Sequence, residues 1–123
     1  MRFCFLVRVL AVLCLAGSIP LARPESKAVT VTGYVLDSAC AFTKGLKKPI
    51  SVECAQKCAK NGSPLVILAD NGAIYWPTTD AMPADSQNGK LMPFAGQRVT
   101  ASGKLFERGG SRALMIEKID AAK

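Results

Sequence analysis

The sequence contains no histidine. This absence excludes the Ser-His-Asp and Cys-His arrangements of nucleophilic catalysis, zinc sites with histidine ligands and the Cys-x-x-Cys-His haem attachment. It also removes the group that most often transfers protons at neutral pH. Because the chain has neither a glycine-rich phosphate loop nor a nucleophile elbow, we expect that it is not an enzyme.

The sequence also lacks an apolar run long enough to cross a membrane. Residues 3–16 are apolar except for Arg8, whereas a spanning helix needs ~20 such residues. Arg2 precedes this run and Pro20 follows it, a pattern typical of a cleaved signal peptide. Cys14 lacks the small residue that lipoprotein processing requires just before the cysteine, so we expect no stable membrane anchor.

These features divide the chain into three segments. Residues 1–22 are the expected signal peptide, with a cut site as late as residue 28, and residues 23–28 form a polar linker. Residues 29–120 then make a single domain. The expected location of this domain is the periplasm or the outside of the cell.

The chain is basic, with a net charge of +7 that falls to +5 when Arg2 and Arg8 are removed. Such a charge attracts anionic partners over long range, but only Lys44, Lys47 and Lys48 form a cluster. Export places the domain away from most nucleic acid. The expected partner is therefore an unknown small molecule or a protein of the cell envelope, and not a nucleic acid.

Two predicted strands share a pattern with a central glycine. Small or apolar side chains occupy every second position in residues 29–37, and residues 99–107 repeat this arrangement. The period of two predicts strands with one face inward. Gly33 and Gly103 hold the same place in the pattern, where glycine permits the bend or bulge that a small barrel needs.

Glycine pairs predict two hairpins. Asn71-Gly72 separates apolar runs at residues 65–69 and 73–76, and such a pair is the strongest short hairpin signal because both turn residues need positive φ. Gly109-Gly110 makes a second turn before a last strand over residues 112–119.

The remaining segments predict a loop and two helical pieces. Residues 38–50 are expected to form a loop, and Ser51 is expected to cap a helix over residues 52–60. Residues 77–97 are rich in proline and glycine and are expected to be irregular, with one helical turn around residues 91–95.

This order of elements predicts a mostly β fold. One strand, a hairpin and a second hairpin give a small five-stranded OB-like barrel, with one short Cys-bearing helix between strands one and two. Strands one and four are then neighbours. An SH3-like barrel or a plain antiparallel sandwich is also consistent with five strands.

Three cysteines lie in the predicted domain, and an odd number in an exported protein suggests one disulfide and one free thiol. Cys54 and Cys58 share a helix face with Cβ directions that are poor for bridging each other. Cys40 is the natural partner for either, and we slightly prefer Cys58. A loop of about 15 residues closed in this way contributes about 3 kcal/mol in the chain-entropy model.

The same thiols permit other chemistry, although we otherwise expect no cofactor. Three thiolates can bind a soft metal such as Cu or Zn. Cys40, Cys54 and Cys58 would be the ligands, and the fourth would be one of Asp37, Met82, Met92 and Met115. A redox role is a further alternative, although the spacing is Cys-x-x-x-Cys and not the usual Cys-x-x-Cys.

Tyr75 and Trp76 are the candidate ligand-binding aromatics. They are adjacent on a predicted strand, so only one of them can lie on a binding face. Core packing is the alternative role for both. The sequence thus predicts an exported, disulfide-stabilised module that binds a ligand or a protein.

Several short motifs resemble a group of small exported bacterial domains of unknown function. The motifs are Gly-x-Val-x-Asp-x-x-Cys at residues 33–40, Cys-Ala-x-x-Cys-x-x-x-Gly-x-Pro-Leu at residues 54–65, and Ala-Gly-x-x-Val-x-x-x-Gly at residues 95–103. The resemblance covers residues 29–119 and implies an OB-like fold and export, with no activity. Relatives often carry a histidine where this chain has Ser51, which puts any metal binding at that position in doubt.

Overall fold

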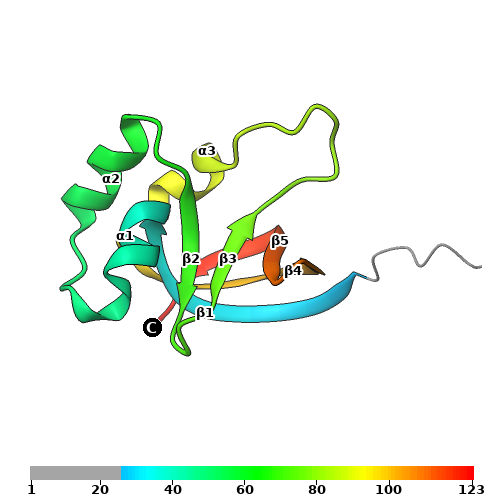
Figure 1. Cartoon of the computed structure of the whole chain (residues 1–123), viewed down its shortest axis with the longest axis horizontal. Coiled ribbons are helices and arrows are strands. Elements are labelled where there is room, and N and C mark those ends of the chain that lie inside the picture. The colour runs from blue at the N-terminus through cyan, green and yellow to red at the C-terminus, as the bar shows by residue number, and fades with distance from the viewer. Residues whose placement is uncertain (1–25) are drawn as a thin grey trace, which may run out of the picture.

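The structure, a computed structural model, describes residues 26–123 (Figure 1). The expected signal peptide lies outside the described residues. The described elements, in chain order, are β1 (Lys27–Asp37), α1 (Ser38–Thr43), η1 (Gly45–Lys47), α2 (Val52–Lys60), β2 (Leu65–Ala69), β3 (Ile74–Pro77), α3 (Asn88–Leu91), η2 (Met92–Phe94), β4 (Arg98–Arg108) and β5 (Ser111–Ala121). No helix in this part of the chain is both long and apolar enough to cross a membrane.

The five strands close into a barrel in the order β1-β2-β3-β5-β4. β1 pairs antiparallel with both β2 and β4, so the predicted neighbourhood of strands one and four is confirmed. β3 and β5 are parallel and close the barrel through only two residue pairs, Trp76 with Ala113 and Pro77 with Leu114. This arrangement confirms the small, mostly β, OB-like barrel that the sequence predicts.

Gly33 and Gly103 allow strands to approach more closely than a side chain would permit. Gly33 pairs with Ala69 of β2 and with Val99 of β4, at the point where β1 passes from one neighbour to the other. A Cβ atom there would overlap the carbonyl oxygen of Leu68. A Cβ atom at Gly103 would overlap the carbonyl oxygen of the residue at position 115 beside the register shift between β4 and β5. Gly103 thus lies at a bulge of the kind that the sequence predicts, whereas Gly33 allows the close approach of β1 to β2.

The core has two parts, which explains the unbroken apolar run of β2. Leu65, Ile67 and Ala69 face the barrel interior, whereas Val66 and Leu68 belong to a second cluster outside it. All five side chains are buried. The second cluster includes buried Ala41 of α1, so this helix covers the outer face of β2.

The predicted loop over residues 38–50 is wrong in its first half. α1 occupies residues 38–43 because Asp37 caps it, its carboxylate accepting a hydrogen bond from the Cys40 N–H at 3.1 Å. Two Cys-bearing α-helices therefore lie between β1 and β2, where one was expected. The second, α2, has the predicted bounds and the predicted cap at Ser51.

Both predicted hairpins are present. Gly109 and Gly110 have φ of 56° and 79°, as a two-residue turn requires. At the β2–β3 turn only Gly72 has positive φ, and its N–H donates to the Ala69 carbonyl at 2.9 Å. That turn is thus a three-residue loop ending in glycine, and the expected positive φ at Asn71 is wrong.

Candidate ligand-binding groove and cysteine pocket

Tyr75 and Trp76 lie on opposite faces of β3. Tyr75 packs against the barrel core, whereas Trp76 and Ile74 pack against the outer cluster. Since successive side chains of a strand alternate, only one aromatic faces outward, as the sequence requires. Of the two candidate aromatics, only Trp76 therefore remains a candidate for contacting a ligand on the outer face of β3.

Phe42 of α1 contacts Trp76 from the side. Their ring centroids are 5.9 Å apart with an angle of 36° between the planes. Phe42 is nevertheless 62% exposed, so the pair presents aromatic surface to solvent. The position of this ring depends on the capped helix α1. The sequence predicted a loop over residues 38–50 in place of that helix and therefore did not predict where the ring lies.

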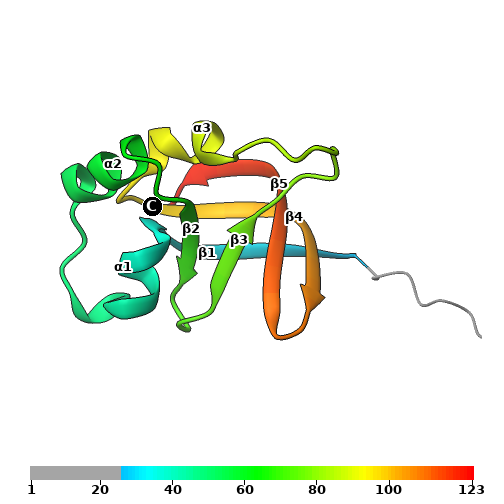
Figure 2. The same cartoon turned by 45° about the horizontal axis from the view of Figure 1, so that its top comes forward.

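A groove runs from this aromatic pair to the β4–β5 turn. It has a volume of about 710 Å³, open solvent included. Figure 2 shows the β2–β3 and β4–β5 turns at the same edge of the molecule. The groove is lined by Phe42, Gly72, Ala73, Ile74, Trp76, Gly110, Ser111 and Arg112.

The chemistry of the groove differs between its two ends. One end is the apolar surface of Phe42, Ile74 and Trp76, and the other is Arg112. The Arg112 Nε donates to the Glu107 carboxylate at 3.2 Å, which holds the guanidinium at the groove's edge. The groove therefore suits a ligand with an apolar or ring-shaped part and a hydrogen-bond acceptor.

A smaller pocket lies between α1, η1 and the start of α2. Its volume is about 320 Å³ including open solvent, but the space that a water-sized sphere can occupy is only about 20 Å³, enough for about one water molecule. Cys58 does not line it. The residues that do are Leu36, Asp37, Cys40, Lys44, Gly45, Lys48, Pro49, Ile50, Ser51, Cys54 and Ala55.

The surroundings of two thiols favour their protonated forms. A hydrogen bond with the Asp37 carboxylate, together with burial, raises the pKa of the Cys40 thiol above that of an ordinary cysteine, and nearby Lys48 offsets only part of this. Burial raises the pKa of the Cys58 thiol, and Asp37 and Cys54 add to the effect. Both thiols are therefore mostly protonated at neutral pH.

The structure holds Cys40, Cys54 and Cys58 as free thiols, each half-buried. The disulfide of Cys40 with Cys58 or Cys54 therefore stays a prediction. Among the described residues, no three Cys, Asp or Glu side chains are grouped as metal ligands. Met82 is 96% exposed, and Met92 packs against the barrel core. The ligand set for Cu or Zn that the sequence allows is thus not assembled.

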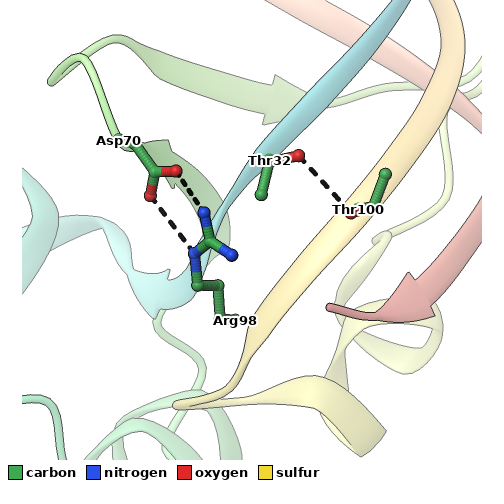
Figure 3. Close-up of polar contacts among 4 residues, drawn as sticks. All are labelled: Thr32, Asp70, Arg98 and Thr100. Carbon is green, nitrogen blue, oxygen red and sulfur yellow. Dashed lines mark hydrogen bonds and ion pairs between the residues drawn. The ribbon is translucent and has the colours of Figure 1, made fainter. Parts of the chain in front are cut away.

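A third polar feature lies on the outer surface of β1 and β4 (Figure 3). Arg98 donates from two nitrogens to the two carboxylate oxygens of Asp70, which raises the pKa of the guanidinium. The hydroxyls of Thr32 and Thr100 lie 3.4 Å apart. These contacts join β4 to β1 and to the β2–β3 turn. The charge of Arg98 is paired with that of Asp70.

No family model, curated protein or solved structure matches this chain. Its function is therefore inferred from the groove and the cysteine pocket. OB barrels bind ligands on the face of strands two and three, between the loop joining strands one and two and the loop joining strands four and five. The groove occupies this place, because its walls come from α1, β3 and the β4–β5 turn.

Proposed function

We propose that this chain is an exported binding module that holds its ligand in the groove over Phe42 and Trp76. The observation that carries the proposal is a largely exposed Phe42 ring against Trp76, set between the two loops that flank OB binding faces. A groove that combines apolar surface with a small number of polar groups, here Ser111 and Arg112, is typical of small-molecule and peptide sites.

The ligand class follows from the two ends of the groove. Ring stacking on Phe42 and Trp76 favours a sugar, an aromatic group or an apolar side chain. The net charge of +5 favours an anionic group beside it, and Arg112, whose charge is already paired with Glu107, offers a further hydrogen-bond donor. We therefore propose an acidic small molecule or an acidic segment of an envelope protein. Export rests on the N-terminal pattern and on the resemblance to small exported domains.

Trp76 makes a direct test possible, since it is the only tryptophan of the chain. We would titrate the mature protein with uronic acid tetrasaccharides, matched neutral tetrasaccharides and acidic twelve-residue peptides while following tryptophan emission. We expect a saturable change with an acidic probe. Calorimetry on Phe42→Ala should show affinity lowered by about fivefold, since one aromatic contact contributes on the order of 1 kcal/mol.

Lys118→Ala is the matched control, because Lys118 is an exposed β5 residue that does not line the groove. This variant should bind as the wild type does. If a probe binds with equal affinity to the wild type and to Phe42→Ala, the groove is not its site. If none of the three probe classes binds at millimolar concentration, the proposed acidic ligand class is wrong.

A further inference from the structure

Cys40 and Cys54 hold the same position in two different helices. Each is the third residue of a capped helix. The Asp37 carboxylate accepts a hydrogen bond from the Cys40 N–H at 3.1 Å, and the Ser51 hydroxyl accepts one from the Cys54 N–H at 3.2 Å. Because these caps fix the first helical turns, the backbones that carry the two thiols are held in place.

Cys40 and Cys54, with the capping residues Asp37 and Ser51, line the cysteine pocket. The room inside is that of about one water molecule, so the walls that carry Cys40 and Cys54 enclose a narrow space. Cys58 lies one turn further along α2 and does not line it. Cys40 and Cys54 are half-buried, so a small reagent in solvent has access to them.

We propose that Cys40 and Cys54 are a redox pair whose disulfide joins α1 to α2, while Cys58 stays a free thiol. The pocket thus favours Cys54 over Cys58 as the partner of Cys40, against the slight preference taken from the sequence. Closing the bond draws together the first turns of the two helices and removes the space between them. This site is separate from the groove, so its test is independent of the proposed binding function.

The oxidant in this reaction is a small disulfide such as oxidised glutathione. The Cys54 thiolate attacks one sulfur of the oxidant, forms a mixed disulfide and releases one glutathione thiolate. The Cys40 thiolate then attacks the Cys54 sulfur and releases the second glutathione. Two protein thiols lose two electrons and two protons, and one oxidant disulfide becomes two thiols.

The test is to incubate the mature protein in buffers of increasing oxidised-to-reduced glutathione ratio, with a chelator present. Free thiols are counted and the disulfide-linked peptides are identified by mass spectrometry. We expect the thiol count to fall from three to one and the linked peptides to contain Cys40 and Cys54. The Tm of the oxidised form should rise by on the order of 10 °C.

Single substitutions distinguish this pairing from the alternatives. Cys58→Ser should still form the disulfide and show the same rise in Tm, whereas Cys54→Ser should keep two thiols and show no rise. A Cys40–Cys58 link as the main product overturns the proposal, and so does a wild-type protein that keeps three thiols throughout the series. Cys54→Ala repeats the test if the serine variant does not fold.

Discussion

Close backbone approaches fix the identity of single residues in this barrel, and Gly103 is the sharpest example. A side chain there would overlap a carbonyl of β5, whereas a Cβ at Gly89 in α3 would meet nothing within 4 Å. We expect Gly103→Ala to lower the free energy of unfolding by about 2–4 kcal/mol, because the strand must move to admit the methyl group.

Gly89→Ala is the matched control for this substitution. It should be neutral or stabilise the protein by up to about 1 kcal/mol, because Gly89 lies in a helix without positive φ. Urea unfolding of both variants measures the difference. If Gly103→Ala is as stable as Gly89→Ala, β4 and β5 do not approach each other this closely at Gly103.

Asp37 controls the reactivity of Cys40. Because the hydrogen bond with the Asp37 carboxylate raises the pKa of the Cys40 thiol, the thiolate fraction should grow at higher pH than it does for an ordinary cysteine. Asp37→Asn removes the negative charge and keeps an effective N-cap. We expect this variant to be alkylated faster at pH 7.5, with the midpoint of its pH profile shifted downward.

Iodoacetamide labelling followed by mass spectrometry gives this profile when Cys54 and Cys58 are both replaced by serine. Lys48→Ala should act in the opposite direction and slow alkylation, because Lys48 stabilises the thiolate. Equal labelling rates at every pH for the proteins with and without the Asp37→Asn substitution would show that Asp37 does not act on the thiol.

At the scale of elements, the Arg98–Asp70 ion pair connects the start of β4 with the β2–β3 turn. The side chains are 38% and 51% exposed, and exposed pairs contribute about 0–1 kcal/mol. We therefore expect Asp70→Asn to lower the free energy of unfolding by less than about 1 kcal/mol. The loss should shrink in 1 M salt because of screening. A loss above 2 kcal/mol, or one that salt does not change, would contradict this view.

Local sequence signals predicted most of the elements. The period of two identified β1 and β4, a glycine turn located each hairpin, and Ser51 located the start of α2. α1 was not predicted because its six residues are too few to show a helical period. Its cap, Asp37, is also the last residue of β1 and was assigned to that strand alone.

The candidate site depends on contacts that one-dimensional patterns do not specify. The groove joins α1 to the β4–β5 turn, which is about 70 residues away along the chain. The sequence made Tyr75 and Trp76 candidates for ligand binding without a preference between them. Only the packing of β3 against two separate clusters shows which of the two side chains faces outward. The choice between Cys54 and Cys58 likewise rests on which thiol lines the pocket.

At the scale of the whole molecule, the barrel bears on where the expected signal peptide would be cut. β1 begins at Lys27, and both Lys27 and Ala28 pair with β4. Cleavage after Ala28 would remove these two residues from the barrel, whereas cleavage after Ala22 leaves β1 whole. We therefore expect a mature N-terminus at Arg23, which intact mass and N-terminal sequencing of the exported protein would measure. A mature chain beginning at Val29 would show that the first β1–β4 pairs are dispensable.

The two-residue pairing between β3 and β5 has a consequence for how the molecule opens. Every other junction of the barrel is antiparallel, and the β1–β4 and β4–β5 junctions run over eight or more residue pairs. Amide protons near Trp76 and Ala113 should therefore exchange with solvent through local opening, at a lower free energy than those of the β1–β4 ladder. The groove crosses this junction from Trp76 to Arg112. A bound ligand would bridge this short parallel junction and slow amide exchange on both sides of it.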